Sequence, residues 1–135
     1  MMPKLDSIKC GKYELKFDRT LVMGILNVTP DSFYDGKLFF NPDKAIEHAK
    51  RMVKDGADII DIGGESSRPG SEPVSEKEEL GRVSQIIKKI KDKINVPISI
   101  DTYKPKVAEE CIKLGASIIN DINGLRDTKM IEVAS

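Results

Sequence analysis

Apolar residues along this chain occur in two patterns, as short continuous runs and as stripes that recur every three or four positions. Short runs are typical of buried parallel strands, and stripes at this spacing are typical of helices that pack on such strands. The runs predict strands at 21–27, 59–62, 98–101 and 118–120. The stripes predict a helix after each strand.

The ends of the expected helices carry recognisable signals. Asn41 precedes a proline and is suited to cap the first helix, while Ser75 and Glu78 have the spacing of a capping box for the second. Gly56 and Gly115 are suited to end the first and third helices. The third helix is expected to open at Pro105, and the last to be capped by Asp127 or Thr128.

Four short strand–helix units imply a parallel sheet with right-handed crossovers. No strand is followed by a Gly-x-Gly-x-x-Gly pattern, which argues against a dinucleotide-binding fold. The better fit is an α/β TIM (β/α)8 barrel, a fold of about 250 residues. Residues 21–135 would supply its first four βα units. Residues 8–17, turning at Gly11, predict a hairpin within 1–20 that closes the bottom of the barrel. We therefore interpret 1–135 as the N-terminal half of one domain.

A half barrel has a stability problem. If about six inward apolar side chains lost burial at about 1.5–3 kcal/mol each, the loss of about 10–18 kcal/mol would match a typical domain's net stability of about 5–15 kcal/mol. We expect that residues 1–135 do not stand as a stable monomer and have no activity on their own. The chain is expected to be a segment of a longer protein, or to be completed by a second half.

Composition narrows the class of partner. The chain has 22 basic and 22 acidic side chains, so no net field attracts nucleic acid or an anionic membrane. No apolar run approaches about 20 residues and the N-terminus lacks a signal-peptide core, so we expect neither membrane insertion nor export. Cys10 and Cys111 are isolated, which favours a reduced, cytoplasmic setting.

Amide and carboxylate side chains stand at or near the carboxyl ends of the expected strands. They are Asn27, Asp61, Asp101, Asn120 and Asp121. In a barrel these ends share one mouth, where such oxygens suit Mg²⁺ and hydrogen-bonding heterocycles. One histidine and two distant cysteines do not make a zinc site. Asp61 has a second interpretation, because a carboxylate between two isoleucines can simply brace the barrel.

Two connections near this mouth, 28–40 and 63–74, are longer than the usual 2–6 residues and are plausible lids. The first carries Asp31, Phe33 and Asp35. The second places Arg68 beside two serines, a combination suited to a phosphate or carboxylate. Arg68 as an ordinary loop cation is the alternative.

Four segments resemble the successive signatures of the dihydropteroate synthase family. They are MGILNVTPDSFYDG within 21–36, ADIIDIGGESSRPG at 57–70, PISIDTYKP at 97–105 and ASIINDING at 116–124. The resemblance covers residues 21–135. It implies a TIM-barrel transferase of folate biosynthesis that condenses 6-hydroxymethyl-7,8-dihydropterin pyrophosphate with p-aminobenzoate and releases pyrophosphate, with Mg²⁺ assisting. The resemblance also implies a homodimer of the full-length protein and competition by sulfonamides.

The same resemblance implies roles for eight residues. Asn27 would lie near the metal and the pyrophosphate, and Asp101 and Asn120 would hold the pterin ring. Asp35 and Arg68 would organise the closed catalytic site, with Phe33, Ser67 and Pro69 beside p-aminobenzoate. Position 67 is often threonine in this family. The family's later lysine and Arg-x-His elements have no counterpart in this sequence.

Two other functions stay open. One is a pterin-binding methyltetrahydrofolate methyltransferase, against which the DSFYDG and ESSRPG loops argue. The other is a non-catalytic pterin-binding relative, or an assembly partner of another half barrel.

Overall fold

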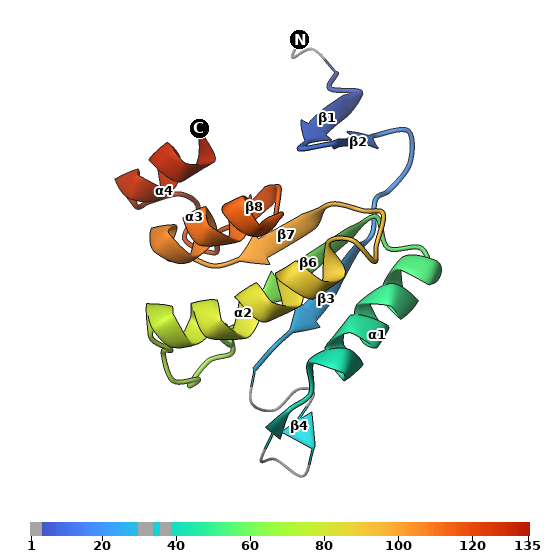
Figure 1. The fold of residues 1–135 in the computed structure, drawn as a ribbon. Helices are drawn as coiled ribbons and strands as arrows, with labels where there is room; N and C mark the ends of the chain where they lie inside the picture. Colours follow the sequence, from blue (N-terminus) through green and yellow to red (C-terminus); the bar gives the residue numbers. More distant parts are fainter. Residues whose placement is uncertain (1–3, 30–33, 36–38) are drawn as a thin grey trace.

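The computed structural model describes residues 4–29, 34–35 and 39–135 of the chain. It begins with the antiparallel strands β1 (Ser7–Cys10) and β2 (Tyr13–Lys16), which confirm the predicted hairpin. Gly11 occupies the turn with φ +61°, a left-handed conformation that glycine adopts without strain. In Figure 1 this hairpin lies at one end of the molecule.

The larger sheet has four parallel strands in the order β3-β6-β7-β8. Their bounds are β3 (Met23–Asn27), β6 (Ile59–Gly63), β7 (Ile98–Asp101) and β8 (Ile118–Asn120). This sequential parallel order is the beginning of a TIM barrel and confirms the predicted fold class. The first strand starts two residues later than expected, because Leu21 and Val22 continue the apolar run but precede the ladder. The second strand runs one residue further, to Gly63.

Helices follow the strands at the expected places. They are α1 (Pro42–Lys54), α2 (Glu76–Ile90), α3 (Pro105–Leu114) and α4 (Thr128–Ala134). Two further short strands, β4 (Tyr34–Asp35) and β5 (Phe39–Phe40), pair with each other between β3 and α1. The Asn41 side chain accepts hydrogen bonds from two backbone N–H groups of the first turn of α1, and Ser75 accepts one from Glu78. Asp127, not Thr128, caps α4.

The core lies between the sheet and its helices, which Figure 1 shows packed along the strands. Strand side chains that are fully buried there include Leu26, Ile60, Ile62 and Ile100, and Ile119 of β8 is partly buried against them. The helices contribute Ala45, Ala49, Val83, Ile86, Ile87, Ile90, Val107 and Cys111. Burial of these apolar stripes is the main force that holds helices on a sheet.

The hairpin closes the amino-terminal end of the other sheet face, as predicted. Cys10 and Leu15 pack against Ile59, with Leu21 and Ile118 around them. On the same face, Met23, which pairs with Ile59, and Ile25 are 38% and 50% exposed. The strands β3 and β8 are the sheet edges. Exposed inward side chains and open edges are what half of a barrel is expected to show.

Among the helices of the described ranges, none is both long and apolar enough to span a bilayer.

Candidate functional site

One row of residues crosses the carboxyl end of the sheet. Strand register pairs Asn27 with Gly63, Gly63 with Asp101, and Asp101 with Asn120. Residues paired in register point to the same face of a sheet, which here is the face away from the helix-covered core. Three residues predicted for the site therefore lie side by side, as their places at strand ends indicated.

Gly63 leaves a gap in this row. A Cβ at Gly63 would lie 3.4 Å from Asp101 Oδ2 and 3.8 Å from Asn27 Oδ1. The amide oxygen and the carboxylate oxygen thus converge on the same small space. Among the described residues no group of three or more His, Cys, Asp or Glu side chains is placed to hold a metal ion. Mg²⁺ needs fewer protein ligands, because it keeps several waters and binds substrate phosphates. The Asn27 amide oxygen, which faces this open space beside Gly63, fits that mode of binding.

Asp61 lies beneath this row and is only 2% exposed. Asn120 Nδ2 donates a hydrogen bond of 3.1 Å to Asp61 Oδ2, so the carboxylate orients the amide of Asn120. This contact agrees with the bracing interpretation of Asp61. Within the described part of the chain, Asp61 Oδ1 and the hydroxyl of its register neighbour Ser99 are buried without a hydrogen-bond partner. The floor of the site therefore has unused hydrogen-bonding capacity.

Burial, together with repulsion from Asp61 and Asp121, raises the pKa of the Asp101 carboxyl to about 6. At neutral pH the carboxylate is still ionised, but its charge is costly in this environment. None of the described residues donates a hydrogen bond to this carboxylate, so it is suited to a ligand that brings N–H groups.

The second predicted loop forms a groove next to the row. Ser67, Arg68 and Pro69 line a cavity of about 790 Å³ together with Asn27. The loop folds back on itself, because the Ser71 hydroxyl donates to the carbonyl oxygens of Ser66 and Arg68, each at 2.7 Å. These four residues, predicted from two separate sequence segments, thus line one cavity.

Only part of the first predicted loop, 28–40, lies within the described residues. Phe33 and Asp31 lie outside the described residues. Asp35 belongs to the short strand β4, where it pairs with Phe39, and its side chain also lies outside what the structure describes.

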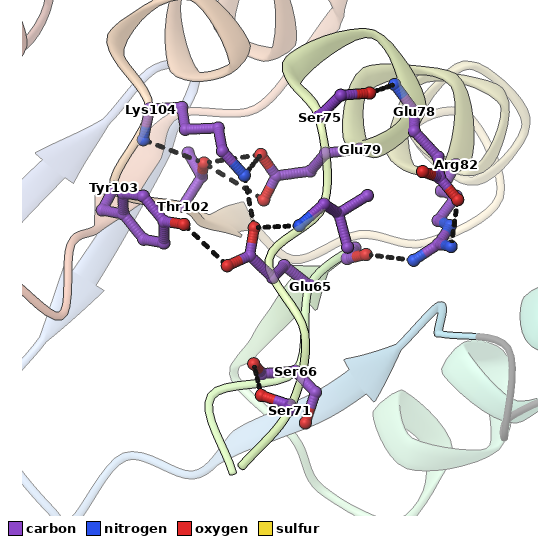
Figure 2. Close-up of polar contacts among 12 residues, drawn as sticks. Glu65, Ser66, Ser71, Ser75, Glu78, Glu79, Arg82, Thr102, Tyr103 and Lys104 are labelled. Carbon is purple, nitrogen blue, oxygen red and sulfur yellow. Dashed lines mark hydrogen bonds and ion pairs between the residues drawn. The ribbon is translucent and has the colours of Figure 1, made fainter. Parts of the chain in front are cut away.

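Sequence reasoning missed a buried polar network behind the groove, shown in Figure 2. Lys104 Nζ forms an ion pair with Glu65 Oε2 and lies 3.3 Å from Glu79 Oε2. Tyr103 donates its hydroxyl to Glu65 Oε1 at 2.7 Å. Thr102 Oγ1 lies 3.2 Å from Glu79 Oε2. The network joins the β6–α2 loop, helix α2 and the β7–α3 connection.

The charges of this network are mutually dependent. Burial raises the pKa of Glu79 despite the nearby Lys104. For Lys104, burial lowers the pKa but the contacts with Glu65 and Glu79 outweigh it, so its pKa is raised. Burial also opposes ionisation of Glu65, yet hydrogen bonds from Lys104, Tyr103 and the Val74 N–H lower its pKa. One ammonium thus holds two carboxylates in place.

A sequence signal for Glu79 existed. Glu79 lies four residues before Val83 and so occupies the apolar stripe of α2, where it is 1% exposed. A charged residue on a buried stripe requires a partner. Neither Glu65 nor Lys104 has such a signal, because both lie in connections between elements.

Comparison with known proteins gives consistent results. The model of a family described as pterin binding enzyme matches residues 23–135. Dihydropteroate synthase of Bacillus subtilis is 61% identical over 119 residues, covering 87% of this chain and 42% of that protein.

Solved structures agree with this result. Dihydropteroate synthase of Xanthomonas albilineans with 4-aminobenzoic acid superposes with a TM-score of 0.89 at 41% identity, over 95% of this chain and 47% of that one. The Burkholderia cenocepacia enzyme complexed with 7,8-dihydropteroate gives 0.81 at 46% identity, over 94% and 41%. The chain spans less than half the length of each of these relatives.

Proposed function

Because this chain belongs to the pterin binding enzyme family, we propose that its full-length gene product is a dihydropteroate synthase. The reaction joins 6-hydroxymethyl-7,8-dihydropterin pyrophosphate to p-aminobenzoate. The bond between the pterin methylene carbon and the diphosphate oxygen breaks, and the arylamine nitrogen bonds to that carbon and loses one proton. The products are 7,8-dihydropteroate and pyrophosphate.

The main support for this proposal is the row of residues at the carboxyl ends of the four parallel strands. This row consists of Asn27, Gly63, Asp101 and Asn120. An ionised Asp101 can accept two N–H bonds from an amino-substituted heterocycle, and Asn120 offers both a donor and an acceptor. Asp61 fixes the orientation of the Asn120 amide through their hydrogen bond. This set of groups complements the polar edge of a pterin.

The groove lined by Ser67, Arg68 and Pro69 is the proposed place of p-aminobenzoate. The Arg68 guanidinium can pair with a carboxylate or a phosphate, and the Ser67 hydroxyl can donate to either. Asp35 and Phe33 of the first loop would complete the closed site. The 4-aminobenzoic acid of the Xanthomonas albilineans structure supports the choice of second substrate.

Mg²⁺ is the proposed metal, and the amide oxygen of Asn27 would hold the ion together with the diphosphate and water. When bound with the diphosphate, Mg²⁺ would neutralise negative charge on the leaving group. The chain's own residues bind and orient the pterin and, with the loops closed, keep water from the reactive methylene carbon. A strong general base is not required for departure of pyrophosphate from an electron-rich pterin.

Three further properties belong to the same proposal. The full-length protein would be a cytoplasmic homodimer, sulfonamides would compete for the groove beside Ser67, and residues 1–135 alone would be inactive. Comparing 1–135 with the full-length gene product in the same assay tests the last point.

The activity itself is tested with purified full-length gene product, both substrates and Mg²⁺. We expect formation of dihydropteroate and pyrophosphate in equal amounts. Methyl transfer from methyltetrahydrofolate without dihydropteroate formation would instead identify a methyltransferase. Pterin binding with neither reaction would identify a non-catalytic relative.

Asp101→Ala tests the pterin assignment, and the exposed Asp92→Ala is its matched control. We expect Asp101→Ala to abolish pterin binding and Asp92→Ala to leave it unchanged. Pterin affinity of the Asp101 variant close to that of the unaltered protein would refute this assignment.

A further inference from the structure

We propose that Glu65, Lys104 and Glu79 form a positioning clamp that fixes the loop carrying Ser67, Arg68 and Pro69, and thereby sets the affinity for the arylamine substrate. The inference rests on the proposed function. It adds three positioning residues, which lie behind the groove and do not line it.

The clamp brings together three parts of the chain that are distant in sequence. Glu65 comes from the start of the β6–α2 loop, Glu79 from the first turns of α2, and Lys104 from the connection between β7 and α3. Lys104 Nζ pairs with both carboxylates, as Figure 2 shows. Tyr103 and the Val74 N–H donate further hydrogen bonds to Glu65, at 2.7 and 3.3 Å. Glu65 is therefore held both by the β7–α3 connection and by the far end of its own loop.

Burial makes these contacts effective. The side chains of Glu65 and Lys104 are each 13% exposed, and that of Glu79 is 1% exposed. Charge pairs removed from water have stronger mutual attraction, and breaking one of them leaves a charge without compensation. The loop is thus confined by an interaction that solvent cannot easily replace.

The loop is also anchored at its first residue. Arg82 Nη1 donates to the Gly64 carbonyl at 2.8 Å. A Cβ at Gly64 would lie 2.9 Å from Val83 Cγ1, so the backbone there is pressed against α2. Residues 66–71 begin one position after the clamp residue Glu65. A change in the direction of Glu65 would therefore be transmitted directly to Ser67 and Arg68.

The row at the carboxyl ends of the strands, called the pterin row below, is held in place by other contacts than the groove. Asn27, Asp101 and Asn120 are terminal residues of strands that a backbone ladder keeps in register. Across the described ranges, no hydrogen bond joins any of the three to Glu65, Lys104 or Glu79. Loss of the clamp should thus release the groove and leave the pterin row in place.

The central test uses Glu65→Gln in the full-length gene product. Glutamine has nearly the same shape and keeps an oxygen that can accept from Tyr103, but it loses the charge that binds Lys104. We expect KM for p-aminobenzoate to rise at least tenfold. Pterin affinity should stay within twofold, and kcat at saturating p-aminobenzoate within threefold.

Two more variants measure coupling. Lys104→Met should raise the same KM at least as much, and the Glu65→Gln, Lys104→Met double variant should show no additional increase, because both changes break one interaction. Lys106→Met is the matched control. That lysine is 61% exposed on α3 and forms ion pairs with Glu109 and Glu110, which are 44% and 33% exposed, so KM should not change.

Lys104→Met leaves two buried carboxylates near each other without a cation. If this variant does not fold, the Glu65→Gln variant alone tests the positioning role. A lower unfolding temperature of Glu65→Gln with unchanged KM would overturn the proposal and identify a purely structural ion pair. An equal loss of pterin affinity would overturn it as well. Failure of the proposed function is distinct, because the unaltered protein would then form no dihydropteroate.

Discussion

Replacing Asp101 by asparagine should stabilise the ligand-free protein while removing its ability to bind pterin. The pKa of this carboxyl is raised from its ordinary value of 3.8 to about 6 by burial and by Asp61 and Asp121. The folded protein therefore takes up a proton more readily than the unfolded chain. Above about pH 6 the ionised carboxylate opposes folding, and below about pH 4 this opposition is absent because both states are protonated.

The size of the effect follows from the two pKa values. At about 1.4 kcal/mol per pKa unit, the interval from 3.8 to about 6 corresponds to about 3 kcal/mol of unfolding free energy. The asparagine amide is neutral and nearly the same shape as the carboxyl, but Asp101 is only half-buried, so solvent screening reduces the gain. We therefore expect Asp101→Asn to gain about 1–3 kcal/mol at about pH 7.5 and nothing at about pH 4.

Urea unfolding of the ligand-free, full-length gene product at these two pH values provides the measurement. Asp92→Asn is the matched control, since Asp92 is exposed. Its unfolding free energy should follow that of the unaltered protein at both pH values. Destabilisation by Asp101→Asn at about pH 7.5 would refute the reasoning, because the carboxylate would then have a stabilising partner in the folded state.

The same titration predicts the pH dependence of pterin binding. The ionised form of Asp101 accepts the ligand's N–H groups, so affinity should fall as pH decreases through about 6, by about tenfold per pH unit below it. Titration calorimetry between about pH 5 and 8 measures this. A flat affinity profile would contradict the role given to Asp101.

The remaining predictions concern stability and are all measured by urea unfolding of the full-length gene product. Gly64→Ala should cost about 1–3 kcal/mol, because its Cβ would lie 2.9 Å from Val83, whereas Gly81→Ala, in open space on α2, should gain about 0.5–1 kcal/mol. Equal effects of the two would contradict the proposed close packing at Gly64. Ile100→Ala removes a fully buried side chain and should cost about 2–5 kcal/mol, against less than about 0.5 kcal/mol for Ile122→Ala at a 66% exposed position. A hydrogen bond from Arg19, with one from the Val22 N–H, lowers the pKa of Asp58 to about 2, so the stability this contact provides should be present above about pH 4 and disappear toward pH 2. In Asp58→Asn that acid-dependent loss should be absent, and its persistence would show that another carboxylate causes it.

Much of the fold was predictable because the signals are local. The capping of α2 by Ser75 and of α1 by Asn41 depends on groups two or three residues apart. The strand run 98–101 likewise corresponds to β7 without change. The start of β3 was less predictable. Val22 lies outside the ladder, with its N–H bound to the Asp58 carboxylate 36 residues away.

The strand-end residues of the candidate site were predictable for the same reason, because their signals are also local. Asn27, Asp101 and Asn120 end apolar runs, and strands laid parallel bring such ends to one edge. The sequence could not indicate that Asp61 would hydrogen-bond Asn120 across 59 positions, or that one of its oxygens would remain unpaired.

The sequence by itself determined which polar residues reach the carboxyl edge of the sheet, because alternation along a strand and the end of an apolar run are properties of neighbouring residues. Only the tertiary structure decided which charges meet behind the groove. Glu65 and Lys104 are 39 positions apart in connections without regular periodicity, and they meet because the crossovers through α2 and α3 bring those connections together. An ion pair between distant loops depends on the path of the whole chain, which no local pattern encodes.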